Sequence, residues 1–314
     1  GGIPLNVGAV VSNAGTVFNV FEAMEDKPVI YKFVTVIGEV AKPSIIKVPI
    51  GTSVREVLKK CGGATIEDYD LIMGGPMMGK KISKGEVESR VITKTDGAII
   101  VISKNHYLAE REKVTIEHMK NQAKAACIQC HFCTEMCPRN LIGHPLNPHK
   151  IMRSIALDEM DEKIIKEALI CCECGVCELY ACPMGLSPKR INVYLKGKLR
   201  EKGIRWENKT DKFTAEVLRE YRKIPTERLV ARLQLNKYKR QRLLENEEIN
   251  PTEVRIPLRQ GIGADTNPIV NVGDIVEKGQ VIGIVEEGKM GANVHASISG
   301  VVSEISSNIS IKST

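Results

Sequence analysis

The sequence has few aromatic residues, no long hydrophobic run and no recognisable leader. Phe, Tyr and Trp make up 4% of the 314 residues, and there is a single Trp. The longest apolar runs are pieces such as Ala98–Ile102, whereas a membrane-spanning helix needs roughly 18 apolar residues. The chain starts with Gly-Gly-Ile-Pro, which is neither a signal peptide nor an initiator Met. We therefore expect no transmembrane segment, and we interpret the chain as a processed or excised piece.

Cysteine is the unusual feature of an otherwise ordinary composition. Nine of the ten cysteines fall between Cys127 and Cys182, a window of 56 residues. Small secreted disulfide proteins spread their cysteines along a short chain. One dense block in a larger chain without a signal peptide indicates metal ligation instead. This distribution excludes a plain disulfide scaffold and makes a simple hydrolase a poor interpretation.

Positive charge is concentrated in one segment. The net charge is +7, and residues 196–242 alone contain 16 Lys and Arg against 6 Asp and Glu. The rest of the chain is therefore slightly acidic. A solvated helical linker explains such a run better than a nucleic-acid surface, because the sequence contains no recognised nucleic-acid motif. We expect no nucleic-acid partner.

The spacing of apolar residues predicts a multidomain α+β protein. A helix capped by Ser12 or Asn13 carries an apolar stripe that it cannot bury alone. Alternating strands around a helix capped by Ser53 indicate a β-grasp domain, and short strands with Gly turns indicate a terminal sandwich or barrel. The predicted parts are the first helix (1–30), the grasp domain (31–105), a helical cysteine-rich module (106–200), a basic helical linker (201–250) and the barrel (251–314).

The first cysteine run has the bacterial ferredoxin spacing for a cubane 4Fe–4S cluster. It reads Cys127-x-x-Cys130-x-x-Cys133-x-x-x-Cys137-Pro138. Thiolates three residues apart on a tight loop can all reach one small anionic cluster, while the loop amides point at its sulfides. The fourth cysteine is followed by Pro, leaves the loop and reaches a second cluster.

The second run, Cys171-x-x-Cys174-x-x-Cys177, is followed after four residues by Cys182 and Pro183. Its last gap is one residue longer than the standard spacing. Cys172 is an extra thiol inside the run, and we prefer Cys171 as the ligand because Cys172 would break the two-residue spacing. The role of Cys172 is left open.

The crossed arrangement of such runs predicts two sets of cluster ligands. One cluster is expected on Cys127, Cys130, Cys133 and Cys182, and the other on Cys171, Cys174, Cys177 and Cys137. A pair of zinc sites is the alternative, but zinc commonly takes two well-separated Cys pairs, not two triplets. Nothing in the runs supplies a substrate pocket or an acid–base pair, so we predict electron transfer and no catalytic residue.

Two weaker patterns are interpreted as structural turns. Gly74–Lys80 fits G-x-x-x-x-G-K, but Lys81 follows where a phosphate-binding loop needs Ser or Thr, and Pro76 removes a backbone donor. Glu287–Met290 is similar to a biotin or lipoyl attachment turn, but Gly288 stands where a biotin site has Met. We therefore expect an unmodified relative of the lipoyl and biotinyl barrels.

Several segments resemble one family of flavo-iron–sulfur proteins. IPLNVGAVVSNAGTVFN is similar to the segment that closes the flavin-binding domain in the NADH-binding subunit of respiratory complex I and in the Rnf C subunit. VTVIGEVAKPSIIKVPIGTSVREVLKKCGG, followed by GGPMMG, resembles their soluble-ligand-binding β-grasp (SLBB) domain, and the cysteine runs resemble the Rnf double-cluster module. The barrel-sandwich segment lies after the clusters, which resembles the order in PduS-like cobalamin reductases.

The resemblance implies a function for the whole protein. In that family an NADH-oxidising flavin domain passes electrons through two 4Fe–4S clusters to a corrinoid. The FMN- and NADH-binding domain should precede residue 1, and residues 1–30 should be its end. This chain is therefore expected to carry electrons without binding FMN or oxidising NADH. An Rnf-like or amino-acid-reductase-associated carrier with another acceptor, and a docking or scaffold module, are the alternatives.

The resemblance also implies partners and a location. A redox partner protein or a corrinoid should accept the electrons, and a microcompartment shell or enzyme is a further expected partner. The expected location is the cytoplasm, including the interior of a bacterial microcompartment. The sequence does not give the oligomeric state.

Overall fold

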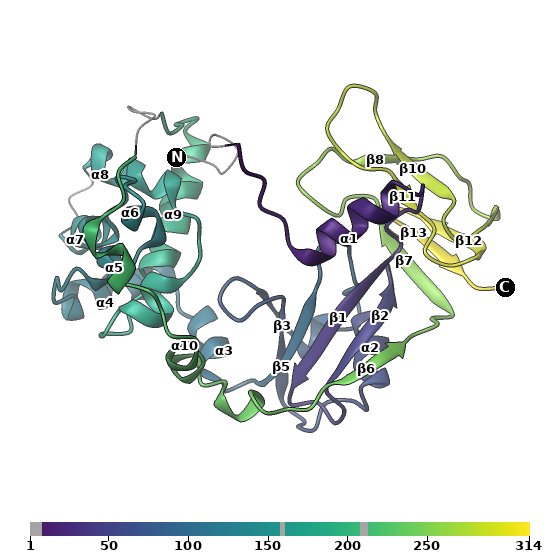
Figure 1. The fold of residues 1–314 in the computed structure, drawn as a ribbon, viewed down its shortest axis with the longest axis horizontal. Helices are drawn as coiled ribbons and strands as arrows, with labels where there is room; N and C mark the ends of the chain where they lie inside the picture. Colours follow the sequence, from purple (N-terminus) through teal and green to yellow (C-terminus); the bar gives the residue numbers. More distant parts are fainter. Residues whose placement is uncertain (1–7, 158–160, 208–212) are drawn as a thin grey trace. The chain divides into compact units, whose positions relative to one another are not determined.

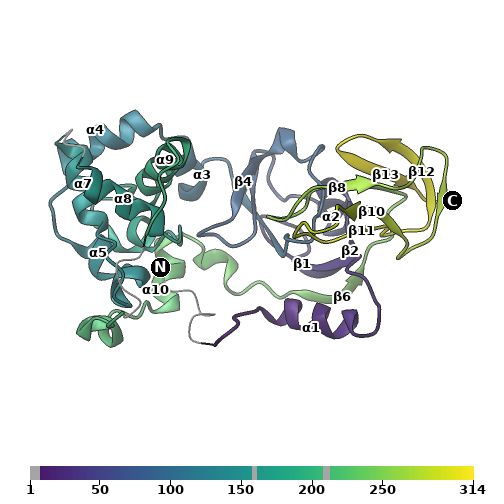
Figure 2. The same ribbon diagram turned by 90° about the horizontal axis from the view of Figure 1, so that it is seen from above.

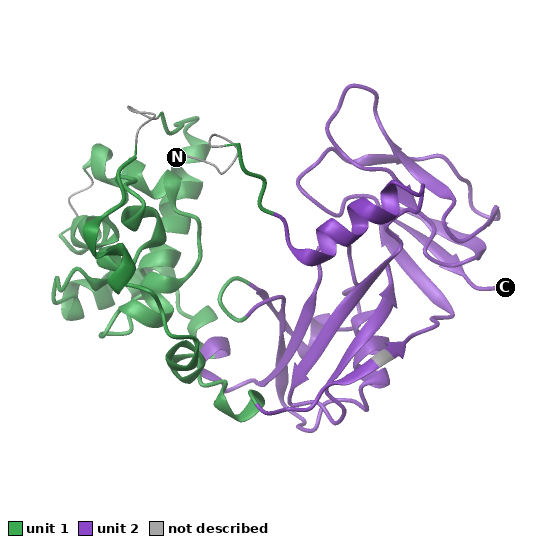
Figure 3. Ribbon diagram, viewed as in Figure 1, with its two compact units in different colours: residues 1–11, 76–78, 110–239 green, residues 12–75, 79–109, 240–314 purple. Residues whose placement is uncertain are grey.

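The computed structural model describes residues 8–157, 161–207 and 213–314. The chain divides into two compact units, which Figure 3 shows in different colours. The first unit comprises residues 1–11, 76–78 and 110–239, and the second comprises residues 12–75, 79–109 and 240–314. Nine of the ten cysteines belong to the first unit.

A six-stranded mixed sheet forms one part of the second unit (Figure 1). Its strand order is β4-β3-β5-β1-β2-β6, with β1 antiparallel to β2 and parallel to β5. Alternation along β1 buries Val34 and Val36, as the period of two predicts. The strands are β1 (Tyr31–Gly38), β2 (Ser44–Pro49), β3 (Tyr69–Met73), β4 (Lys80–Ser83), β5 (Ala98–Ser103) and β6 (Leu244–Glu248).

Helix α2 (Val54–Lys60) packs its apolar side against the core of this sheet. The Oγ atom of Ser53 accepts a hydrogen bond from the Glu56 amide at 3.2 Å, which is the predicted N-terminal cap. Gly62 and Gly63, both with positive φ, follow the helix. Cys61, the cysteine outside the dense block, is buried at the helix end.

Strand β6 is a departure from the predicted basic helical linker. It pairs in parallel with β2, and Glu248 and Glu247 form ion pairs with Lys47 at 3.1 Å and Lys60 at 2.9 Å. The sequence of this strand is almost entirely charged or polar, so it carries no apolar alternation that could have predicted a strand. Long-range pairing with β2 therefore decides its conformation.

The C-terminal part of the second unit is a compact two-sheet structure, as predicted. One sheet has the order β11-β10-β8 and the other β7-β13-β12-β9. Its core includes Ile50 of the grasp domain, whose carbonyl accepts a 2.6 Å hydrogen bond from the buried Ser297 hydroxyl. The strands are β7 (Glu253–Pro257), β8 (Thr266–Pro268), β9 (Ile275–Val276), β10 (Val281–Val285), β11 (Val294–His295), β12 (Gly300–Ile305) and β13 (Asn308–Lys312).

Helix α1 (Ala14–Ala23) keeps its apolar stripe exposed. Asn13 caps it by accepting a hydrogen bond from the Thr16 amide at 2.8 Å. None of the residues of this helix is buried, and Phe18 and Phe21 are 45% and 58% exposed. In Figure 2 the helix lies at the outer edge of its unit. As the sequence predicts, the stripe finds no local partner among the described residues.

The first unit is helical. Its core is formed by apolar residues of α4, α7 and α9, including Met119, Ile151 and Leu195, and it also contains several of the cysteines. Helices α7 and α9 begin at Pro148 and Pro188, the predicted first-turn positions. The helices from residue 107 onward are α3 (Tyr107–Glu112), α4 (Ile116–Ala126), α5 (Phe132–Glu135), α6 (Pro138–Leu141), α7 (Pro148–Ala156), α8 (Glu162–Lys166), α9 (Pro188–Glu201) and α10 (Thr226–Arg232).

The described part of the basic segment contributes packing and ion pairs within the first unit. Arg222 pairs with Glu135 at 2.5 Å, and Leu233 and Tyr238 are buried. Arg222 therefore has a specific partner, which a count of charges along the sequence does not reveal. None of the helices described here is long and apolar enough to span a bilayer.

Candidate metal centres

Two cavities lie in the first unit, and each is lined by cysteines from both runs. The first cavity takes three cysteines from the loop between α4 and α5 and from α5 itself, and one from the loop before α9. The stacked rings of His131 and His149, with centroids 4.1 Å apart, also line it. Its cysteines are Cys127, Cys130, Cys133 and Cys182.

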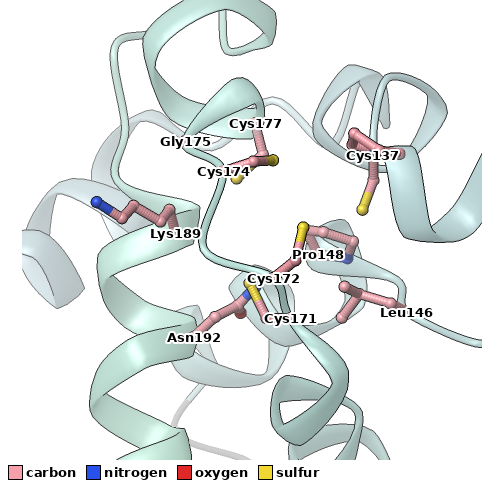
Figure 4. Close-up of a pocket in the computed structure, with 11 residues that line it drawn as sticks. Cys137, Leu146, Pro148, Cys171, Cys172, Cys174, Gly175, Cys177, Lys189 and Asn192 are labelled. Atoms are coloured by element: carbon pink, nitrogen blue, oxygen red, sulfur yellow. The ribbon is translucent and has the colours of Figure 1, made fainter. Parts of the chain in front are cut away.

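The second cavity, drawn in Figure 4, takes its cysteines mainly from the second run. The exception is Cys137, which belongs to the first run and directly precedes α6. The structure thus brings Cys137 and Cys182 each to the cavity of the opposite run. Cys172 lines this cavity as well, so five thiols surround it: Cys137, Cys171, Cys172, Cys174 and Cys177.

The two cysteine loops have left-handed residues at the same two positions. The residues two and four positions after Cys127, Gln129 and His131, have φ of 53° and 65°. The residues two and four positions after Cys171, Glu173 and Gly175, have φ of 60° and 78°. The equivalence of the loops therefore pairs Cys171, not Cys172, with Cys127, and it supports Cys171 as a ligand.

Left-handed residues at these positions have a chemical consequence. Alternating right- and left-handed residues turn successive amides toward one point and create a concave site for an anion. A non-glycine residue in this conformation is strained by about 1–2 kcal/mol. Gln129, His131 and Glu173 all adopt it. Strain of this kind is concentrated at functional sites, and an anionic iron–sulfur cluster fits such a loop.

Hydrogen-bond donors already point at the thiols. The Glu173 amide lies 3.4 Å from the Cys171 sulfur, and the Leu186 amide lies 3.4 Å from the Cys182 sulfur. The Gln129 side-chain amide donates to the Cys127 sulfur at 3.0 Å. N–H···S contacts of this kind stabilise thiolates and influence the potential of a bound cluster.

The gap between Cys177 and Cys182 is one residue longer than the standard spacing, and a π-helical turn, Cys177–Ala181, accommodates the extra residue. A π turn holds one more residue than an α turn, so Cys182 still reaches the first cavity. Arg232 of α10 holds the end of this turn, with its guanidinium 3.3 Å from the Tyr180 carbonyl and 3.1 Å from the Cys182 carbonyl. Arg111 binds the Gly185 and Leu186 carbonyls from another direction.

Burial controls the acidity of the thiols. It raises the pKa of Cys133 to about 12, and the neighbouring Cys182, Cys127 and Cys130 groups add to this effect. It likewise raises the pKa of Cys137 to about 11. These thiols are therefore protonated at neutral pH in the metal-free protein, and their protons must leave when a metal binds. A hydrogen bond with Cys174 lowers the pKa of Cys172.

Three family profiles match the chain. A 4Fe–4S dicluster domain matches residues 126–187, an SLBB domain matches 33–81, and an RnfC barrel sandwich hybrid domain matches 233–314. Cobalamin reductase PduS of Salmonella typhimurium is 42% identical over 306 residues, which are 97% of this chain and 67% of that protein. The chain belongs to the cobalamin reductase PduS family.

Other relatives agree with this assignment. The PduS of Citrobacter freundii is 41% identical over 96% of this chain and 66% of its own length. The C subunit of the proton-translocating ferredoxin:NAD(+) oxidoreductase complex of Clostridium ljungdahlii is 34% identical over 45% of this chain and 28% of its own length. The chain spans about two thirds of the length of the two PduS proteins.

The comparisons confirm the predicted α+β multidomain fold and the family resemblance. The dicluster match confirms the prediction that the cysteine block is an iron–sulfur, electron-transfer module. No three His, Cys, Asp or Glu side chains within the described ranges are grouped to hold a single metal ion. The eight-ligand assignment for this PduS-family chain stays a prediction, and the cavities and loop conformations support it.

Sequence reasoning missed three groups: Gln129 and Asn192, which line the cavities, and Arg232, which binds the carbonyl of Cys182. A signal for Asn192 was present, since the helical period places it on the apolar side of α9 with Pro188, Leu195 and Leu199. The contact of Arg232 with residues 50 positions away has no such local signal.

Proposed function

We propose that this chain carries electrons through two 4Fe–4S clusters. The supporting observation is that each cavity combines the cysteines of one run with a single cysteine of the other, Cys182 in the first cavity and Cys137 in the second, as in two-cluster ferredoxins. When bound, such a cluster accepts and releases one electron at a time. The ligand sets are Cys127, Cys130, Cys133 and Cys182 for the first cavity, and Cys137, Cys171, Cys174 and Cys177 for the second.

The residues around the cavities have defined roles in this proposal. The loop amides and Gln129 stabilise thiolate sulfur, while Arg232 fixes the turn that delivers Cys182. Apolar side chains, including Met152 in the first cavity and Leu146 in the second, limit access of water to the cysteines. These features favour one-electron transfer over binding of a larger substrate.

In the whole protein, we propose that NADH reduces a flavin and that the clusters pass its electrons to a corrinoid. Support comes from the two relatives named cobalamin reductase, which match almost the whole chain. The exposed stripe of α1, including Phe18 and Phe21, fits a helix that ends a flavin-binding domain. Residues 1–30 are then the end of that domain, followed by the SLBB domain (31–105), the dicluster module (106–200), the basic segment (201–250), whose end adds strand β6 to the SLBB sheet, and the barrel (251–314).

Transfer of electrons to cob(II)alamin tests the acceptor. We expect the reduced protein, freed of dithionite by gel filtration under anaerobic conditions, to convert cob(II)alamin to cob(I)alamin, one corrinoid per electron delivered. Visible spectra of the corrinoid follow the reaction, and eluate collected without protein is the control. Reduction of a flavodoxin or ferredoxin, but never of the corrinoid, would reject this acceptor and favour an Rnf-like carrier, the second candidate that the Clostridium ljungdahlii match supports.

A further inference from the structure

Asn192 is a buried polar residue on the apolar side of α9. It is 1% exposed and lies on the same side of the helix as the buried residues Pro188, Leu195 and Leu199. Neither its Nδ2 atom nor its Oδ1 atom has a hydrogen-bond partner among the described residues. A buried amide without partners destabilises a fold, and an apolar side chain at this position would avoid that penalty.

The Asn192 side chain lines the second cavity. Figure 4 shows its amide beside the Cys171 sulfur, whereas Lys189 on the preceding turn extends away from the cysteines. One turn further along α9, the Lys196 ammonium binds the Cys171 carbonyl at 2.9 Å and the Glu173 carboxylate at 2.7 Å. Helix α9 therefore fixes the chain at Cys171 and at the same time aims an unpartnered amide at its sulfur.

A group bound in this cavity accounts for the amide. The sulfides and thiolates of a 4Fe–4S cluster are stronger hydrogen-bond acceptors than the thiols that line the metal-free cavity. Reduction adds a negative charge to the cluster, so a donor stabilises the reduced form more than the oxidised form. A donor at this position raises the reduction potential.

We propose that the Asn192 amide donates a hydrogen bond to a sulfur of the second cluster, or to its Cys171 thiolate, and raises the reduction potential of that cluster. This inference rests on the proposed two-cluster function. Asn192 is a tuning residue, because it acts through sulfur without binding iron. Gln129, whose amide donates to Cys127 at 3.0 Å, is a side-chain donor at the first cavity, although it comes from the cysteine loop and not from a helix.

An EPR-monitored redox titration of Asn192→Leu tests the proposal. Leucine removes the donor at similar size. We expect one of the two midpoint potentials to fall by about 59 mV. For a one-electron couple, this lowers the ratio of reduced to oxidised cluster about tenfold at a fixed potential. Gln129→Met should lower only the other potential. Val193→Ala, at the partly exposed neighbouring position on α9, should change neither.

Each outcome of the titration decides a different claim. Unchanged potentials in Asn192→Leu, with both clusters present by iron content, would overturn the inference and leave the proposed function intact. A wild-type protein without 4Fe–4S signals would overturn the proposed function itself. If Asn192→Leu loses a cluster, Asn192→Ala provides the test, because it removes the donor without adding bulk: both clusters present with a potential at or above the wild-type value would reject the inference.

A second readout separates tuning from a structural role. The metal-free Asn192→Leu protein should be at least as heat-stable as the metal-free wild type, because leucine removes a buried amide without partners. A large loss of stability in the metal-free variant would show that Asn192 supports the fold, and would contradict the inference.

Discussion

Replacing Cys137 by serine is expected to abolish the cluster of the second cavity, although Cys137 belongs to the first cysteine run. The reason is geometric, since Cys137 lines the cavity formed by Cys171, Cys174 and Cys177. Cys182→Ser should abolish the other cluster by the same argument. Each variant should retain about half of the iron of the wild type, because each cluster needs all four thiolates.

The remaining EPR spectrum identifies which cluster is lost. Crossed ligands require Cys137→Ser to leave the same spectrum as Cys171→Ser, and Cys182→Ser the same spectrum as Cys130→Ser. If the ligands were not crossed, Cys137→Ser would instead leave the same EPR spectrum as Cys130→Ser. Cys172→Ser is the matched control, because its thiol lines the second cavity but falls outside the repeated backbone pattern, and it should keep both clusters.

Removing the iron is expected to destabilise the first unit and spare the second. The core of the first unit contains Cys137, Cys171 and Cys182 beside its apolar residues, so the clusters form part of that core. The second unit has two cores of its own, without any of the nine clustered cysteines. Because free energy of metal binding becomes free energy of folding, we expect the melting temperature of the first unit to fall by at least about 10 °C.

Calorimetry of the native and the chelator-treated protein under anaerobic conditions measures this effect. Two transitions are expected, and the transition of the second unit serves as the internal control because it should not move. Equal shifts of both transitions, or no shift of either, would contradict the division of the core between a cluster-dependent and a cluster-independent unit.

Local chemistry made part of the fold predictable. Ser53 and Asn13 cap the helices that follow them, and Pro148 and Pro188 start theirs, because capping and proline geometry depend on a few adjacent residues. The cysteine spacing likewise predicted the iron–sulfur module, since the spacing itself is set by the size of the cluster.

Features that depend on distant residues were not predictable in the same way. Strand β6 forms through its pairing with β2, some 200 residues earlier, and its charged sequence carries no strand pattern. The π turn after Cys177 is visible in the sequence only as one extra residue in the gap. The sequence places Arg232 in a run of basic residues that is typical of a solvated helix. A count of charges cannot show that its guanidinium binds the Cys182 carbonyl.

Quantification of metal and acid-labile sulfide in the anaerobically purified chain, together with EPR of the reduced protein, tests the central claim most directly. The account predicts about eight iron and eight sulfide per chain, with the signals of two 4Fe–4S clusters. A colourless protein with stoichiometric zinc, or one with iron for a single cluster, would contradict it.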